Sequence, residues 1–416
     1  MPWLHLAASD GCGIAAQADA ADIADAPALD RFLRAAGNPM PDAQACLDRQ
    51  PTRAAGYLLR VGIAVAAKDV PSLAIVDETL RAAEHVSLHW TARERAHLAA
   101  ARAWRHGEPL IAAERYAAIL RTWPHDLLAL RLAQSCYFFL GQTSALREVV
   151  DLVWHWWRKD MPGFQYVLAM AAFACAETGE SRRARALAEQ ALEIEPMFPG
   201  AIHTMAHAMA DDPALAARWL REHRAHWQVD SRMRAHIAWH LATFEVEAGN
   251  PIRALELLDR ELLPASMSAS GDAADATALL WRLQLDGIDP GRRWRTLSDS
   301  WAAHSTPGFW GVLDVHAVIA FHAAGHGDRA RRHVAAIELH AQGGTYAAEI
   351  ARNVTCPALR AIGAFAAEEW QSAAAQLRMV LPSLARLGGS QAQHEIFTRM
   401  LRYAQLRRGV AGAVAA

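Results

Sequence analysis

The stretch at residues 165–197, QYVLAMAAFACAETGESRRARALAEQALEIEPM, decides the fold of this chain. Its apolar residues recur at helical spacing on both sides of Gly179, and Pro196 follows the second run. Glycine permits a tight turn between the two runs, and proline prevents the second helix from continuing. Small residues in the second run, among them Ala184 and Ala188, would let two helices approach closely. The stretch therefore predicts a helix–turn–helix unit.

The same frame recurs along the chain at a nearly constant period. Units begin near residues 93, 127, 165, 199 and 235, so successive starts are 34, 38, 34 and 36 residues apart. This period and pattern resemble the tetratricopeptide repeat, a helix–turn–helix unit of about 34 residues. A single unit cannot bury its apolar face alone, so neighbouring units must stack. The sequence thus predicts an all-α, tetratricopeptide-like α-solenoid in which the first helix of each pair lines the concave face.

The repeat frame also suggests a division of the chain. Residues 1–52 are expected to form an N-terminal helical segment, and residues 53–287 hold the tetratricopeptide-like repeats. Beyond Gly287 the frame degrades although helical spacing continues. Residues 288–416 are therefore expected to be degenerate helical repeats that close the array.

Composition and charge argue against several classes of protein. Of the 416 residues, 53% are apolar and 21% are charged, which is typical of a globular chain. Forty-two lysines and arginines against 44 acidic residues give a net charge of −2, so we expect neither a nucleic-acid partner nor a membrane partner. No window holds 18 uninterrupted apolar residues, so no membrane span is expected.

Cysteine usage and the first residues indicate the compartment. The five cysteines form no CxxC pair, which favours a reducing environment. Residues 1–26 lack the basic region of a secretory signal. A cytoplasmic protein is therefore expected. Only two lysines occur, Lys68 and Lys159, and the sequence alone gives this scarcity no functional weight.

Several short strings taken together point to a particular family. They are Arg93-Glu94 with His97, DLLAL (126–130), YFFLG (137–141), HTMAH (203–207), HIAWH (236–240), WRLQLDG (281–287), Asp314-Val-His316 and GGSQAQ (388–393). Together they resemble the tetratricopeptide repeat protein 38 family, over roughly residues 40 to 405. The resemblance implies an all-helical repeat fold curled into a closed superhelix, and it does not supply an established reaction.

Histidines form the most unusual pattern in the chain. Among 20 histidines, four pairs are spaced i,i+4, where chance placement would give fewer than one. Residues so spaced lie on one helical face, one turn apart. The pairs His203/His207 and His236/His240 fall on the first helices of adjacent units, so their side chains should converge. Four imidazoles in one place could hold a transition metal ion, although no particular cofactor is indicated.

Other polar and aromatic residues are expected on the same inner face. Asp314 and His316 lie on a later first helix, and a curled superhelix could bring them to the four histidines, where all six would serve as metal ligands or acid/base groups. Arg131 or Arg282 would orient an anionic substrate group. The full set of candidate substrate-binding residues is His97, Arg131, Tyr166, Trp239, Asp275, Trp281 and Arg282.

Three functions remain open on the sequence alone. The first is a protein whose histidine-lined pocket binds and converts a small molecule. The second is a non-catalytic scaffold that holds a peptide or helix in its groove, a role that tetratricopeptide grooves often have. The third is a structural histidine cluster with pH-dependent stability. An apparent absence of lysine from the inner face favours the first over the second. Trp154, Trp156 and Trp157 form a possible homodimer patch.

Overall fold

The computed structural model describes residues 27–228 and 230–414, and nearly all of them are helical. The α-helices of the first half are α2 (Pro27–Arg34), α3 (Met40–Arg49), α4 (Ala54–Ala67), α5 (Val70–Ala83), α6 (Ala92–Arg105), α7 (Pro109–Thr122), α8 (Leu127–Phe139), α9 (Thr143–Trp154), α10 (Phe164–Glu177), α11 (Ser181–Ile194) and α12 (Pro199–Ala208).

The remaining α-helices are α13 (Pro213–Glu222), α14 (Arg224–Trp227), α15 (Arg234–Glu247), α16 (Pro251–Leu257), α17 (Leu263–Ser266), α18 (Ser270–Leu285), α19 (Arg293–His304), α20 (Gly311–Ala323), α21 (Gly327–His340), α22 (Tyr346–Ile350), α23 (Cys356–Ala366), α24 (Trp370–Val380) and α25 (Gln391–Val414). Two 3₁₀ turns, η1 (Ser87–His89) and η4 (Leu381–Leu387), and two π-helical turns, η2 (Leu258–Leu262) and η3 (Ala351–Thr355), complete the described helices. In the described residues, β-structure is limited to one isolated antiparallel bridge between Ala36 and Ser231.

The helices stack in pairs, which confirms the all-α, tetratricopeptide-like solenoid. The five predicted unit starts coincide within one residue with the starts of α6, α8, α10, α12 and α15. In the deciding stretch, Gly179 separates α10 from α11, and Ala184 and Ala188 are fully buried where these two helices pack. Side chains define several helix starts, as where Thr91 and Glu94 form a reciprocal capping box before α6.

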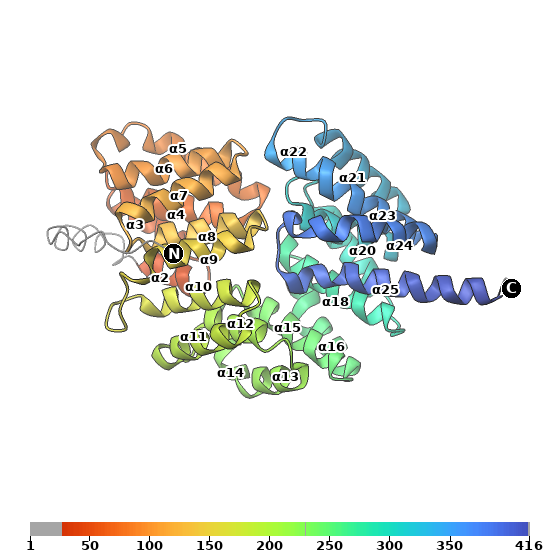
Figure 1. Ribbon diagram of the computed structural model, residues 1–416. Coiled ribbons are helices and arrows are strands. Elements are labelled where there is room, and N and C mark those ends of the chain that lie inside the picture. Colours follow the sequence, from red (N-terminus) through yellow and green to blue (C-terminus); the bar gives the residue numbers. More distant parts are fainter. Residues whose placement is uncertain (1–26, 229, 415–416) are drawn as a thin grey trace, which may run out of the picture.

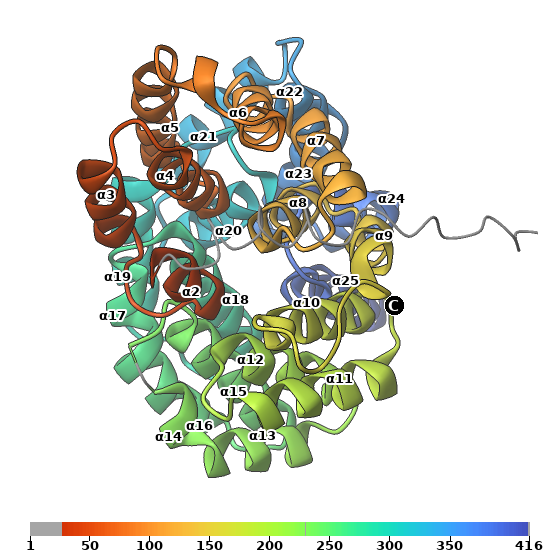
Figure 2. The ribbon, with the colours of Figure 1, turned by 90° about the vertical axis from the view of Figure 1, so that its left-hand side faces the viewer.

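The solenoid curls until its two ends meet. Figure 2 shows the helices arranged around a common centre, with α4–α7 at the top and α11–α16 at the bottom. The orange and yellow helices of the first half lie beside the blue helices of the second half in Figure 1. Phe139, at the end of α8, stacks on Trp310 before α20, with ring centroids 5.3 Å apart. Gln391, at the start of α25, donates to the backbone carbonyl of Glu177 on α10 (3.0 Å). These contacts make the superhelix a closed ring.

Some expectations about the outside of the molecule can now be compared with the structure. None of the described helices combines the length and apolar character needed to cross a bilayer. The tryptophan patch is smaller than expected, because Trp157 is buried and donates to the Pro124 carbonyl, while Trp156 is half exposed. The division at residues 52 and 287 stays a prediction, and residues 1–26 of its first segment lie outside the described residues.

Two glycines with the same backbone conformation provide a test of ring closure. Gly141 (φ +65°) and Gly179 (φ +82°) each end a helix in the left-handed region. A Cβ at Gly141 would lie 1.6 Å from the Ala385 carbonyl oxygen across the ring junction, whereas nothing lies within 4 Å of a Cβ at Gly179.

We expect Gly141→Ala to destabilise the protein by at least about 2 kcal/mol more than Gly179→Ala. Both changes carry the same left-handed strain, of about 1–2 kcal/mol, so the difference reports the junction alone. Thermal unfolding followed by circular dichroism measures the two variants side by side. Equal melting temperatures would show that the junction does not stabilise the ring.

Candidate functional site

Four histidine side chains meet inside the ring. His203 and His207 lie one turn apart on α12, and His236 and His240 lie one turn apart on α15, the next inner helix. The Nε2 atom of His203 is 2.9 Å from Nε2 of His207 and 3.0 Å from Nε2 of His236. One nitrogen from each of the four imidazoles lies within 4.8 Å of the others. The predicted convergence of the two pairs is confirmed, and we call these four residues the histidine cluster.

Two buried carboxylates hold the outer nitrogens of the cluster. Glu177, the last residue of α10, lies 3.1 Å from Nδ1 of His207. Asp275 on α18 lies 2.6 Å from Nδ1 of His236. The Asp275 carboxylate accepts a hydrogen bond, so His236 carries a proton on Nδ1 and, when neutral, an unprotonated Nε2 that faces the centre. The Glu177 carboxylate lies within ion-pair distance of Nδ1 of His207 and favours a proton there.

The start of α25 holds both carboxylates in place. The backbone N–H of Gln391 donates to Glu177 (3.3 Å), and the side-chain amide of Gln393 donates to Asp275 (3.0 Å). The ring therefore has to close before the carboxylates are fixed. A carboxylate with several donors keeps one orientation, which in turn fixes the imidazole that it holds.

The electrostatics of the cluster differ from ring to ring. Burial and the neighbouring charges of His207 and His236 lower the pKa of His203 well below its ordinary value, and burial with the same two neighbours does so for His240. For His236, burial would lower the pKa, but the charge and hydrogen bond of Asp275 outweigh it and raise the pKa. His203 and His240 are thus neutral at pH 7.

The Nε2 atoms that face the centre of the histidine cluster have too few hydrogen-bond donors among them. When each ring has its proton on the Nδ1 atom beside its carboxylate, the inward Nε2 lone pairs of His207 and His236 both face His203, and one hydrogen on His203 can serve only one of them. The Nε2 atom of His240 is buried without a hydrogen-bond partner. Either an additional proton or a cation at the centre relieves this arrangement.

The donor set fits a divalent transition metal. Tetrahedral coordination at a metal–nitrogen distance of about 2.0–2.1 Å separates ligand nitrogens by roughly 3.3 Å. Two nitrogen separations here are 2.9 and 3.0 Å, and all four nitrogens lie within 4.8 Å of one another. Neutral imidazoles leave the charge of such an ion uncompensated, and the two adjacent carboxylates, Glu177 and Asp275, supply the two balancing negative charges. All four rings could ligate, and the metal-ligand prediction for them is therefore retained.

A cavity of about 260 Å³ lies next to the histidine cluster. Three cluster members, His203, His207 and His236, line it, while His240 lies behind them. Much of the remaining wall is apolar, formed for example by Phe138 and Phe173. A metal held by the cluster would therefore face the cavity on one side and His240 on the other.

Several other predicted residues lie at this cavity or directly behind its wall. Arg131 and Tyr166 line the cavity, and the Tyr166 hydroxyl donates to Asp30 on α2. Trp239 is fully buried and stacks on the His236 ring, with centroids 5.3 Å apart. Asp275, expected to bind substrate, instead contacts Nδ1 of His236.

The structure does not bring the remaining predicted residues to the cavity. Asp314 turns toward α21, where it pairs with His333 (3.0 Å). The Nδ1–H of His316 donates to the Val312 carbonyl of its own helix (2.6 Å), and burial lowers the pKa of His316 to about 4. Neither joins the histidine cluster, because each finds its partner on or beside its own helix pair.

His97, Arg282 and Trp281 also lie elsewhere. His97 and Arg93 both contact the buried carboxylate of Asp126, at 2.9 and 2.7 Å. Burial would raise the pKa of Asp126, but its interactions with His97 and Arg93 outweigh burial and hold the pKa below its usual range. Arg282 donates to the Ala392 carbonyl of α25 (2.6 Å), and Trp281 packs between other aromatic rings. Their positions indicate packing and ring closure.

Sequence reasoning missed three kinds of residue at this site. It did not single out Glu177 or the two glutamines of α25, because nothing local marks them as partners of histidines on other helices. It also expected no lysine on the inner face, and that expectation is wrong, since Lys68 lines the cavity. The scarcity of lysine could have drawn attention to Lys68, because the chain has only two lysines and one of them lies at this cavity.

The comparisons with known proteins add little about function. No family model matches the chain. A solved structure described as "Human IFIT1 dimer with PPP-AAAA" has a TM-score of 0.43 and 14% sequence identity to this chain, covering 89% of this chain and 86% of that one. At this identity the likeness is one of fold, and no residue role passes from one protein to the other.

The same solved structure corrects one expectation. The net charge of −2 was taken to exclude a nucleic-acid partner, yet that structure holds the RNA PPP-AAAA. Recognition of an anion depends on the local charge that lines an interior and is not governed by the net charge of the whole chain. The exclusion of nucleic acid is therefore wrong as an inference from net charge.

We expect the charge of Asp275 to control metal affinity at the histidine cluster. Asp275→Asn keeps a hydrogen-bond acceptor for His236 but removes the negative charge, so Zn²⁺ affinity should fall about 10- to 100-fold. Competition with a chromogenic chelator measures the affinity. Asp314→Asn is the matched control, because it removes a buried carboxylate that lies outside the cluster. An unchanged affinity in folded Asp275→Asn would contradict the role assigned to this residue.

Proposed function

We propose that this protein binds a divalent transition metal at His203, His207, His236 and His240 and converts a small molecule in the adjacent cavity. The observation that carries the proposal is the meeting of four imidazole nitrogens beside a cavity that three of the rings line, with buried carboxylates next to the outer nitrogens of two rings. A divalent metal held there would supply Lewis-acid polarisation of a substrate oxygen.

The chain's own residues would perform the rest of the work. Glu177 and Asp275 keep protons on the outer nitrogens of His207 and His236, so the inner nitrogens stay available as ligands. His240 closes the buried side of the cluster. The apolar walls around Phe138 and Phe173 exclude water, which strengthens every electrostatic interaction inside the cavity. Because three of the four histidines line the cavity, a substrate there would lie beside the metal.

The size of the cavity favours a small molecule over an extended peptide. A volume of about 260 Å³ lies slightly below the roughly 300–1,000 Å³ of drug-sized ligand sites, so the cavity suits a small organic compound. Tetratricopeptide scaffolds bind extended peptides in long grooves, and a cavity of this volume is too small for that mode. We therefore place the enzyme or small-molecule binder ahead of the scaffold.

Membership in the tetratricopeptide repeat protein 38 family is also proposed. The strings that carry the resemblance include HTMAH and HIAWH, which contribute the histidine cluster, and GGSQAQ, which contributes the two glutamines that hold its carboxylates. Strings far apart in the sequence thus meet at one site, which supports a shared function for them. A cytoplasmic location remains a prediction from the cysteine usage.

Metal content is the direct test. Untagged protein purified without chelator is expected to hold about one equivalent of a transition metal by inductively coupled plasma mass spectrometry. The double variant His203→Ala/His207→Ala should lose it while keeping its helical circular dichroism. Asp314→Asn again serves as the control that retains the metal. Absence of metal from wild-type protein, even after dialysis against Zn²⁺, Co²⁺ and Mn²⁺, would remove the metal-dependent mechanism.

Turnover is tested on the same samples. Metal-loaded protein and the double variant are each incubated with a fractionated small-molecule extract, and compounds consumed or formed are followed by mass spectrometry. We expect at least one conversion that depends on both the metal and the intact histidine cluster. Conversion of the same compound by both samples would place the chemistry elsewhere.

A further inference from the structure

Lys68 occupies an unusual position for a lysine. It follows the last residue of α4 with a left-handed backbone (φ 54°) and lines the cavity. Its ammonium donates to the Ala66 carbonyl and to the Ser135 hydroxyl, each at 3.0 Å, and lies 5.9 Å from the ring centroids of Phe138 and Trp310. Its direct contacts are therefore neutral groups and aromatic rings, while the charges of Arg131, Arg232 and the adjacent Asp69 also act on it.

Arg131 lines the same cavity from α8. Its guanidinium lies over the ring of Phe32, 6.0 Å from the centroid. Within residues 27–228 and 230–414, neither Arg131 nor Lys68 forms an ion pair with a carboxylate. Two buried arginines elsewhere differ, because Arg93 pairs with Asp126 and Arg282 pairs with Glu395. Lys68 and Arg131 are half-buried, and at the cavity they lack the acid that accompanies those two arginines.

Two cations without an anion in a largely apolar cavity are costly to the fold. Burial and the charge of Arg131 lower the pKa of Lys68 to about 7, and burial and the charge of Arg232 lower that of Arg131 to about 10. Such a cost indicates that the cations serve a ligand, since a buried unpaired charge destabilises a protein unless a partner arrives. A negatively charged ligand group would relieve both.

We propose that Lys68 and Arg131 bind the anionic group, a carboxylate or a phosphate, of the small molecule that enters the cavity. The planar guanidinium fork suits two oxygens of either group, and the lysine adds a point charge from the neighbouring helix. The role of this site as the anchor of a substrate rests on the proposed function, whereas the binding of an anion at the site does not. An anion held here places the rest of the molecule in the cavity that His203, His207 and His236 also line.

Inorganic phosphate and acetate are the probes for the anion site. Each is titrated calorimetrically into full-length, chelator-treated protein at constant ionic strength, so the metal contributes nothing. We expect at least one probe to bind, and Lys68→Met and Arg131→Met each to weaken it at least tenfold. The preferred probe assigns the site to a phosphate or a carboxylate. No binding of either probe, or unchanged binding in folded Lys68→Met, would overturn the proposal.

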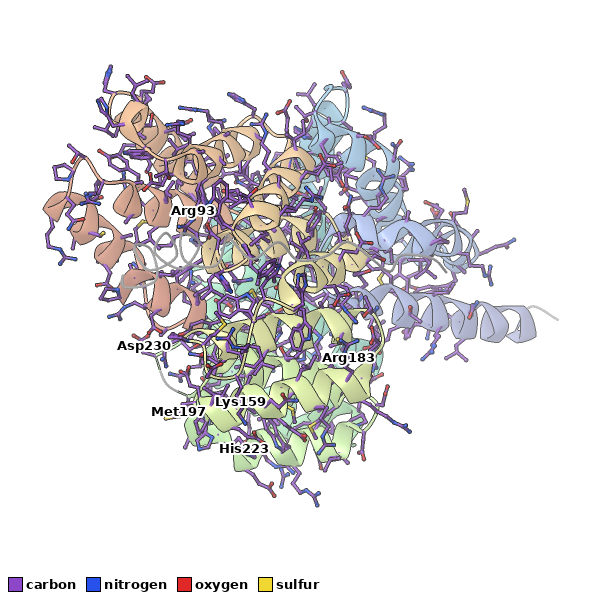
Figure 3. The ribbon with its side chains drawn as sticks, turned by 60° about the vertical axis from the view of Figure 1, so that its left-hand side comes forward. Arg93, Lys159, Arg183, Met197, His223 and Asp230 are labelled. Carbon is purple, nitrogen blue, oxygen red and sulfur yellow. The ribbon has the colours of Figure 1, made fainter. Side chains whose placement is uncertain are left out.

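The other lysine is the matched control. Lys159 lies in the loop between α9 and α10 and is about 77% exposed (Figure 3). Lys159→Met removes the same charge from the chain without touching the cavity, so it should bind the probe as the wild type does. A loss of binding in Lys159→Met equal to that in Lys68→Met would show that only overall charge matters, and that result overturns the site.

The pH dependence of anion binding distinguishes a Lys68 that binds the anion from a Lys68 with only a structural role. Its lowered pKa means that part of the protein carries a neutral amine at pH 7, and an anion would draw a proton onto it. Acetate remains a monoanion from pH 6 to 8.5, so its affinity should fall about tenfold across this range as Lys68 loses its charge. In Lys68→Arg, whose guanidinium stays charged, binding should persist with little pH dependence. The same steep pH dependence in Lys68→Arg would contradict the assignment.

The two proposals can fail separately. The anion titration uses chelator-treated protein and the metal content is measured on untreated protein, so each result stands without the other. Metal in the wild type without binding of either anion probe would overturn the anion site and leave the metal site standing. Anion binding without any metal in the wild type would leave the anion site standing and remove the metal-dependent mechanism.

Discussion

Closure of the helical ring is the constraint on which the rest of the structure depends. At the junction, Phe139 stacks on Trp310, and the turn at Gly141 lies so close to the Ala385 carbonyl that no side chain fits between them. The closed ring turns the concave face, which is open in an ordinary solenoid, into an interior. Polar groups on that face then lose water, and each must find a partner within the ring.

The histidine cluster shows how this interior is organised. Its rings come from two adjacent helices, but the carboxylates that orient them come from α10 and α18, and the donors that hold those carboxylates come from the start of α25. Three layers of contact thus join opposite parts of the ring at one point. The same closure leaves Lys68 and Arg131 facing a small cavity without an ion-pair partner. One part of the cavity wall thus carries imidazole nitrogens and another part carries cationic side chains.

The fold could be predicted closely because it depends on local chemistry repeated at a fixed period. Gly179 and Pro196 bound their helices, small residues allow close packing, and all five predicted unit starts match helix starts within one residue. The meeting of His203 and His207 with His236 and His240 followed from the same frame, since adjacent inner helices lie side by side. By contrast, Asp314 and His316 were expected to join them across the ring, and they do not. The repeat period indicates which helices are neighbours, but it does not indicate which side chains meet across the ring.

The sequence by itself thus determined the helical class, the repeat boundaries and the histidine pairs, because each depends on residues within one or two neighbouring units. Only the tertiary structure decided that Glu177 and Asp275 orient the imidazoles, that Arg282 and His97 serve packing, and that Lys68 reaches the cavity. Several of these outcomes depend on contacts between residues far apart in the chain, 67 positions for Lys68 with Ser135 and 214 for Glu177 with Gln391. Such contacts are set by the curvature that accumulates over many repeats, and no local pattern encodes where a curved array meets itself.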